Sequence, residues 1–106
     1  MKVALLLISF ALAANAYAGD PAKGQKKAAQ VCAACHGPDG NKPSAPDQPV
    51  LAGQYEDYLV RALSDYKNGR RTNPVMKGFA GQLSKQDIED LAAWFASQKS
   101  ELHDQR

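Results

Sequence analysis

The sequence predicts a small all-α domain made of three main helices joined by long irregular loops. Hydrophobic residues recur at helical spacing in residues 54–71 and 83–100, and a helix-start signal precedes a third segment near residue 21. No segment shows the alternation of polar and apolar residues that is typical of a half-buried strand. Residues 37–53 and 72–82 are rich in proline and glycine. Irregular loops of this length are unusual in so small a domain, so we expect them to wrap around a bound group.

Residues 1–18 are predicted to be a cleaved secretory signal peptide, which leaves one domain of residues 19–106. Lys2 is followed by an uncharged apolar run over residues 3–14, and Ala16 and Ala18 form the small-x-small pattern of a cleavage site. The run is shorter than the roughly 20 residues of a membrane span. An uncleaved N-terminal anchor is the alternative. Export would place the domain in the periplasm, an oxidising compartment in which an unused cysteine pair tends to form a disulfide.

The charge balance gives little information about partners. The 106-residue chain has 13 Lys and Arg against 11 Asp and Glu, a formal net charge of +2. This is near neutral, so it does not indicate a nucleic acid partner, and we expect none. A chain this short buries only a modest core and often depends on a disulfide, a metal or a cofactor.

The first helix is predicted to begin after Asp20, which is a good N-cap, with Pro21 in the first helical position. It is expected to run through residues 22–35 and to stop near residues 36–38, where glycine and proline follow the histidine. The second helix lies within residues 54–71, and Gly69 is its expected C-terminal cap. Its apolar stripe consists of Tyr55, Tyr58, Leu59, Ala62, Leu63 and Tyr66.

The third helix lies within residues 83–100. Ser84 is the expected N-cap, and Asp87 three residues later resembles the partner residue of a capping box. The apolar face of this helix consists of Ile88, Leu91, Ala92 and Phe95.

The segment VCAACHGPDG, residues 31–40, contains both cysteines of the chain and one of its two histidines. A structural zinc site requires four ligands. The cysteine and histidine side chains that could serve are Cys32, Cys35, His36 and His103. The adjacent residues 35 and 36 would fit one tetrahedral ion poorly. A redox-active thiol pair is typically found at the N-terminus of a helix after a strand. Here the pair ends the first predicted helix, where the helix dipole raises the pKa of a thiol.

Covalent attachment of haem explains the details of this segment better. C-x-x-C-H is the attachment signature of c-type haem. Cys32 and Cys35 are three residues apart and therefore project from one face of a helical turn. From there they could form thioether bonds to the two vinyl groups of one haem, and His36 could bind the iron. The haem would also supply the apolar core that so short a chain lacks.

Haem iron with one histidine ligand has a second axial position, which methionine, histidine or no protein group can fill. Met76 is the only methionine after the predicted cleavage site and lies in a proline- and glycine-framed segment that we expect to be an irregular loop. It could be an ordinary core residue, since methionine fills gaps in cores. We favour it as the distal ligand, because a thioether is typical of an electron-transfer haem. His103, near the C-terminus, is the competitor.

The chain resembles the class I c-type cytochromes, in particular the short single-haem bacterial periplasmic type and one half of the di-haem relatives. The matching residues are 19–41, 49–63, 66–71 and 73–98. They combine C-x-x-C-H, a Pro-x-Leu-x-Gly segment, a later methionine and an amphipathic helix with aromatic residues. The resemblance implies a small cytochrome c fold with one covalently bound haem c.

The resemblance also implies roles for particular residues. Cys32 and Cys35 would carry the thioethers, His36 would be the proximal iron ligand and Met76 the distal one. The carbonyl of Pro49 would accept a hydrogen bond from the other ring nitrogen of the proximal histidine, which fixes its tautomer and raises its basicity.

Further roles follow for residues outside the ligand set. The first and last helices of the family cross with a small residue against an aromatic one, for which Gly24 and Trp94 are the candidates. Arg61 or Trp94 could donate a hydrogen bond to a haem propionate. The three tyrosines of the second helix are expected to lie in the core and at the edges of the haem pocket.

With both axial positions filled by protein, the iron has no place for a small-molecule substrate. The sequence shows no Ser/His/Asp set, paired carboxylates or phosphate-binding loop. We therefore expect one-electron transfer between respiratory redox partners, by a protein that is not an enzyme. The alternatives are a haem sensor or peroxidase-like protein with a labile distal ligand, and an electron-entry subunit of a larger oxidoreductase.

Partners are expected to be redox proteins that bind weakly and briefly, and the chain itself to be a monomer or a weak dimer. Four basic residues in or beside the two loops are candidates for steering an acidic partner to the haem edge: Lys42, Arg70, Arg71 and Lys77.

Overall fold

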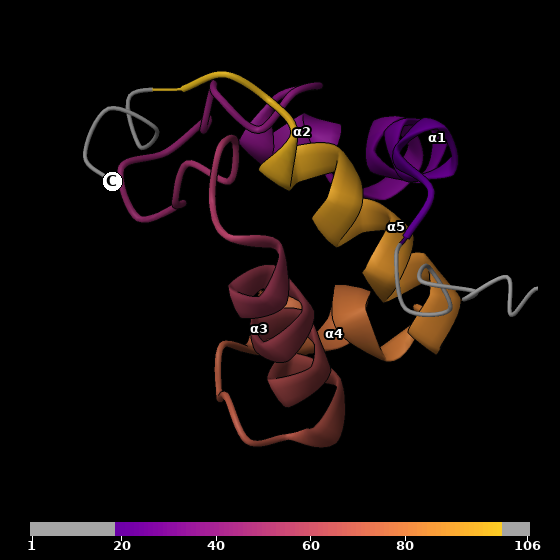
Figure 1. Ribbon diagram of the computed structural model, residues 1–106. Coiled ribbons are helices and arrows are strands. Elements are labelled where there is room, and N and C mark those ends of the chain that lie inside the picture. The colour runs from indigo at the N-terminus through magenta and orange to yellow at the C-terminus, as the bar shows by residue number, and fades with distance from the viewer. Residues whose placement is uncertain (1–18, 101–106) are drawn as a thin grey trace, which may run out of the picture.

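The computed structural model describes residues 19–100, so the predicted signal peptide and His103 lie outside the described residues. Within residues 19–100 the chain forms five helices and no strand, which confirms the all-α prediction (Figure 1). The helices are α1 (Pro21–Val31), α2 (Ala33–His36), α3 (Glu56–Asn68), α4 (Pro74–Gly81) and α5 (Lys85–Ala96).

The first helix begins as predicted and ends earlier than predicted. The side chain of Asp20 accepts hydrogen bonds from the backbone N–H groups of residues 22 and 23, and Pro21 is the first helical residue. α1 ends at Val31, and Cys32 forms a turn that separates it from the four-residue helix α2. α2 ends at His36, and its C-cap Gly37 has a φ of 84°, a conformation that favours glycine.

The caps of α3 and α5 confirm the sequence prediction. α3 ends at Asn68, and its C-cap Gly69 has the left-handed conformation (φ 81°). α5 begins with a complete capping box. The Ser84 side chain accepts a hydrogen bond from the Asp87 backbone N–H, and the Asp87 carboxylate accepts one from the Ser84 backbone N–H. These hydrogen bonds to Ser84 hold the pKa of the Asp87 carboxyl below its usual value.

The expectation that residues 72–82 form an irregular loop was wrong. Residues 74–81 form helix α4, which has Met76 as its third residue. Pro74 is tolerated because it occupies the first helical position, where no hydrogen bond from its nitrogen is needed. The side chain of Asn73 caps the helix, and the two glycines do not break it.

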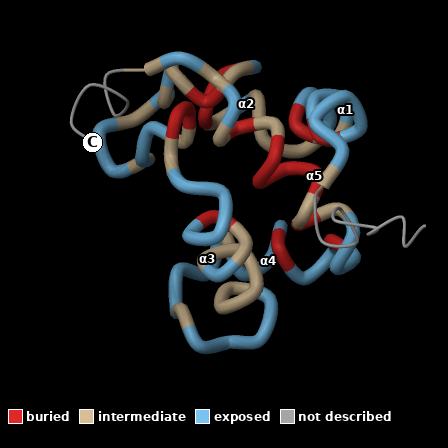
Figure 2. The backbone as a smooth tube through the Cα atoms, in the orientation of Figure 1, coloured by how far each residue is buried: buried red, intermediate tan, exposed pale blue. Residues whose placement is uncertain are grey.

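The core lies between α1, α3 and α5. The apolar face predicted for α5 is buried, and Ala28, Leu59 and Leu83 pack against it. Figure 2 shows buried segments concentrated along α5 and on the side of α1 that faces it. The three tyrosines were expected in the core and at the edges of the haem pocket. Tyr58 and Tyr66 line the cavity described below, whereas Tyr55 is about half exposed and does not line it.

α1 and α5 cross at a very short distance, which confirms the expected contact between Gly24 and Trp94. A Cβ atom added to Gly24 would lie 1.9 Å from the carbonyl oxygen of Asp90 and 2.8 Å from the Cβ of Trp94. A Cβ atom added to Gly19 would lie 1.9 Å from the carbonyl oxygen of Glu89. The start of the described chain therefore packs directly on the backbone of α5.

Polar groups tie other segments to α5. The buried carboxylate of Asp90 accepts a hydrogen bond from the backbone N–H of Asp20 (2.7 Å) and one from the side chain of Gln86 (2.9 Å). The indole N–H of Trp94 donates to the carbonyl of Pro38 (3.2 Å). These bonds hold the start of α1 and the loop after α2 against one helix.

Within residues 19–100, no helix combines the length and the hydropathy that a membrane crossing requires.

Candidate functional site

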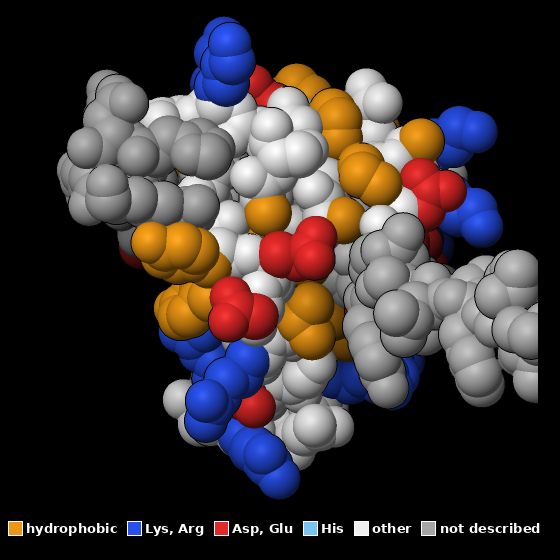
Figure 3. Space-filling view, viewed as in Figure 1, with side chains coloured by type: hydrophobic (Ala, Val, Ile, Leu, Met, Phe, Trp, Pro, Cys, Tyr) orange, Lys and Arg blue, Asp and Glu red, His pale blue; other side chains and the backbone are white. Residues whose placement is uncertain are grey.

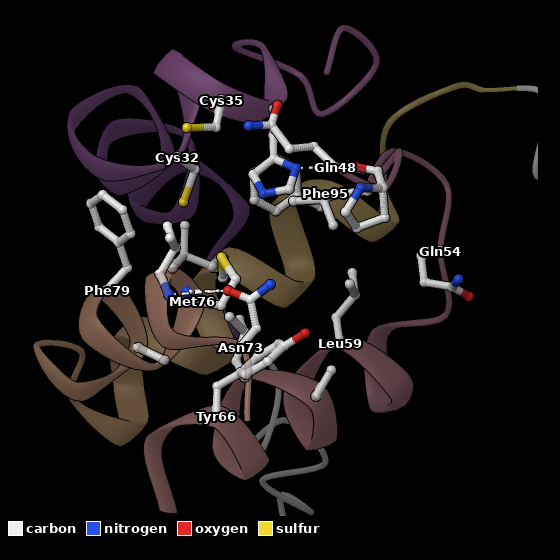
Figure 4. A pocket seen from close by; sticks show the side chains of 18 of the residues that line it. Cys32, Cys35, Gln48, Gln54, Leu59, Tyr66, Asn73, Met76, Phe79 and Phe95 are labelled. Carbon is white, nitrogen blue, oxygen red and sulfur yellow. Dashed lines mark hydrogen bonds between the residues drawn. The ribbon is translucent and has the colours of Figure 1, made fainter. Parts of the chain in front are cut away.

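A cavity of about 320 Å³ lies between α2, the segment 47–54, α3 and α4. Its walls include Cys32, Cys35, His36, Pro49 and Met76, which are the five site residues predicted from the sequence. In Figure 4 the two cysteines lie at the top of the view, and the methionine comes from α4 below them. The fold therefore places in one cavity residues that are up to 44 positions apart in the sequence.

The two cysteines are free thiols, and both line the cavity. Burial, together with the neighbouring Cys35, raises the pKa of the Cys32 thiol to about 11. A thiol with this pKa is protonated at neutral pH and is a poor nucleophile for thiol–disulfide exchange. Within residues 19–100, no group of three or more His, Cys, Asp or Glu side chains is placed to hold a metal ion. Among residues 19–100 the site thus lacks the features that favour the thiol-redox and zinc alternatives.

His36 is buried, and its ring is held by one hydrogen bond. Its Nδ1 atom lies 3.0 Å from the carbonyl oxygen of Pro49, which can only accept, so Nδ1 carries the proton. The Nε2 atom of this tautomer keeps a free lone pair and can act as a metal ligand. A carbonyl partner of this kind fixes ring orientation and raises the basicity of the ligand atom.

Gln48 organises the loop that presents this carbonyl, and sequence reasoning missed it. Its side-chain oxygen accepts hydrogen bonds from the backbone N–H of Ser44 (2.9 Å), the Ser44 hydroxyl (2.9 Å) and the backbone N–H of Ala45 (3.1 Å). The backbone N–H of Ser44 also donates to the carbonyl of Cys35 (2.8 Å). The loop is thereby closed on itself and tied to α2. A glutamine in a proline-rich loop gave no sequence signal for this role.

Met76 is positioned by Asn73, the second residue that sequence reasoning missed. The Asn73 side-chain oxygen accepts hydrogen bonds from the backbone N–H of Val75 (3.0 Å) and of Met76 itself (3.1 Å). The signal was present, since asparagine followed by proline is a typical start of a helix. It was overlooked because the following glycines indicated a loop.

The rim of the cavity is unusually apolar and exposed. Val50, Tyr58, Val75 and Phe79 all line it, and Val75 is 61% exposed. Large exposed apolar side chains gathered around one opening are typical of a surface that a ligand or partner covers. Two thiols, an imidazole and a thioether line one mostly apolar cavity, so the chemistry of the residues present fits a covalently bound haem.

The residues proposed for propionate binding do not line the cavity. Neither Arg61 nor Trp94 is in its wall, and the indole N–H of Trp94 is already bound to Pro38. Arg71 does line the cavity, and its guanidinium lies over the ring of Tyr66, 4.8 Å from the centroid. Such stacking holds the cation in place. Arg71 is therefore the basic residue of the cavity wall that is placed to bind an anionic group.

The four basic residues proposed for steering do not form one group. Arg70, Arg71 and Lys77 lie together, because the Lys77 ammonium lies beside Gly69, 3.9 Å from where a Cβ atom would be. Figure 3 shows Lys and Arg side chains gathered at this end of the molecule, over the end of α3 and the loop that follows. Lys42 instead packs against Gly37, after α2, at the opposite end.

An all-α domain with a C-x-x-C-H turn, a carbonyl-bound histidine and a methionine around one apolar cavity defines the c-type cytochrome class. The family model Cytochrome c matches residues 21–99. The chain is 55% identical over 95 residues to cytochrome c4 of Pseudomonas aeruginosa, and the match covers 89% of this chain and 46% of that relative. It is 41% identical to cytochrome c-554(548) of Halomonas halodenitrificans over 85 residues, which cover 77% of this chain and 100% of that relative.

The crystal structure of reduced recombinant cytochrome c4 from Pseudomonas stutzeri is similar in fold, with a TM-score of 0.71 and 49% identity. That similarity covers 77% of this chain and 47% of the other. The chain belongs to the cytochrome c family, and this membership implies a covalently bound haem c with its iron. It spans about half the length of the cytochrome c4 relatives that it matches.

Proposed function

We propose that this chain is a periplasmic one-electron carrier that holds one haem c. Cys32 and Cys35 carry the thioether bonds, His36 is the proximal iron ligand and Met76 the distal one. The bound haem supplies an iron that alternates between Fe(III) and Fe(II). The observation that supports this proposal is that all four side chains line a single apolar cavity.

The protein groups account for the properties that an electron carrier needs. Pro49 holds the tautomer of His36, and Asn73 holds the backbone of Met76, so both ligand side chains extend from fixed positions. The apolar walls and a thioether ligand both favour the reduced state, which gives a relatively high potential. With His36 and Met76 both bound to the iron, no position would be left there for a substrate. This distinguishes the carrier from a haem sensor or a peroxidase-like protein, and the same site would also serve in an electron-entry subunit.

The optical spectrum and mass of the protein, purified from the periplasm of a host that attaches haem, test this proposal. We expect the mass of residues 19–106 plus one haem, sharp c-type bands on reduction, and the weak long-wavelength sulfur-to-iron band in the oxidised form. Covalent haem without the sulfur band, together with carbon monoxide binding by the native protein, would contradict the carrier and favour the sensor or peroxidase. Absence of covalent haem would overturn the whole assignment.

The basic cluster of Arg70, Arg71 and Lys77 is proposed to steer an acidic redox partner. Ferricyanide serves as an anionic probe in place of the partner. We expect its rate of oxidation of the ferrous protein to fall several-fold in the double variant Arg70→Glu/Lys77→Glu at about 10 mM ionic strength, where the Debye length is about 30 Å. The difference from wild type is expected to vanish at about 1 M salt.

The matched control is Lys23→Glu/Lys26→Glu on α1, which changes the net charge equally at a site away from the cluster. We expect a much smaller effect there. Equal effects in both double variants would mean that only the net charge matters, and a rate independent of ionic strength would exclude steering.

A further inference from the structure

We propose that Asn73 is the positioning residue for the distal ligand, and that its cap on α4 sets how firmly Met76 remains on the iron. This inference rests on the proposed function, because it takes Met76 to be a ligand. The direct observation is that the side-chain oxygen of Asn73 accepts hydrogen bonds from the backbone N–H groups of Val75 and Met76. The cap thus acts on the backbone of the ligand residue itself.

Apart from its packing against α3, the helix that carries Met76 has few buried side chains to hold it. α4 has eight residues, two of them glycines, and a helix of this length is marginal in water without support. Only Ala80 of α4 is fully buried, whereas Val75, Lys77, Gly78 and Phe79 are exposed. Burial therefore contributes less to α4 than to α5, which has six buried residues.

The polar contacts of α4 lie at its two ends. At the C-terminal end the ammonium of Lys67 donates to the carbonyl of Leu83 and lies 3.5 Å from that of Gly81. At the N-terminal end the contact is the Asn73 cap. Met76 is only three residues from that cap and five from Gly81, so loss of the cap would free the turn that carries the ligand.

Asn73, Met76 and Tyr66 all line the cavity, and Figure 4 draws the Asn73 carboxamide among these lining side chains. Asn73 therefore lines the same cavity as Met76 and also caps the backbone that carries it. Replacement by alanine removes the acceptor for two backbone N–H groups and leaves Pro74 as the only start signal of the helix. The turn with Met76 would then open more often, and an external ligand could take its place on the iron.

The test is imidazole binding by the ferric holoprotein, followed by the loss of the sulfur-to-iron band. We expect Asn73→Ala to raise the apparent affinity for imidazole about fivefold, the factor that corresponds to loss of a typical N-cap. Asn73→Ser, which keeps an acceptor, is expected to stay within twofold of wild type. Asn73→Thr, a weaker cap, is expected to fall between them and provides the comparison if the alanine variant does not accumulate.

The matched control is Ser84→Ala, which removes the equivalent cap of α5, where Ser84 accepts from the backbone N–H of Asp87. This variant is expected to lower the unfolding midpoint while leaving imidazole affinity unchanged. Equal rises in affinity for Asn73→Ala and Ser84→Ala would show a general loss of stability and overturn the inference, as would no rise in Asn73→Ala. If Met76 is not the ligand, the result can be told apart from these outcomes, because the sulfur-to-iron band would then be absent from the wild type.

Discussion

Replacement of Met76 by alanine is expected to remove the sulfur-to-iron band, open the distal side of the haem and lower the reduction potential. The thioether stabilises Fe(II), and axial ligands set haem potentials over a range of about 0.8 V, so a fall on the order of 0.1 V or more is expected. The ferrous variant should also bind carbon monoxide, which the wild type should exclude. Potentiometric titration and optical spectra of the two holoproteins measure these effects.

Met76→His is the control for this experiment. It provides a second nitrogen ligand, so it is expected to restore resistance to carbon monoxide while the sulfur band stays absent and the potential stays low. If the wild type lacks the sulfur band and the alanine variant keeps the wild-type potential, Met76 is not the ligand. Attention would then turn to His103, which lies outside the described residues.

Replacement of Gly24 by alanine is expected to cost about 3 kcal/mol or more of unfolding free energy, the upper end of the usual cost of overpacking. The added Cβ atom would lie 1.9 Å from the carbonyl oxygen of Asp90 and 2.6 Å from its carbonyl carbon. Both are backbone atoms of α5, which cannot rotate away as a side chain can. Relief requires α1 and α5 to separate, which exposes Ala28 and the apolar face of α5. Denaturant unfolding of the ferric holoprotein gives the value.

Gly78→Ala is the matched control for this substitution. Gly78 is also within a helix, and a Cβ atom added there would meet nothing within 4 Å. Alanine is a better helix former than glycine by about 1 kcal/mol, so this variant is expected to be slightly more stable than wild type. If both alanine variants behave alike, the close packing at Gly24 is not what stabilises the helix crossing.

The elements predicted correctly from the sequence are those whose ends carry local chemical signals. Asp20 with Pro21, Gly69, and Ser84 with Asp87 each cap a helix through contacts within a few residues, so no knowledge of the fold is needed to recognise them. α4 was missed although Asn73 and Pro74 carry the same kind of signal. Two glycines in a short segment outweighed it, and the helix depends on its packing against α3.

The residues of the candidate site also fall into two groups: those with a local sequence signal and those whose position depends on the fold. The order of Cys32, Cys35 and His36 along one turn of chain could be read directly, since their relation is local. The contact between Nδ1 of His36 and the carbonyl of Pro49 was expected only from the family resemblance, because residues 13 apart can lie anywhere relative to each other until the loop is closed. The loop contacts of Gln48 and the stacking of Arg71 on Tyr66 were found only in the structure, since they depend on side-chain contacts that no periodicity or spacing indicates.

By itself the sequence determined the helix caps, the thiol pair with its adjacent histidine, and the apolar face of the last helix, because these depend on residues within one or two turns. The tertiary structure decided that Met76 faces the same cavity as His36, 40 residues away, and that Gly24 meets the backbone of α5. The physical reason is that such distances are set by the packing of α1, α3 and α5, which depends on the shape of many side chains at once.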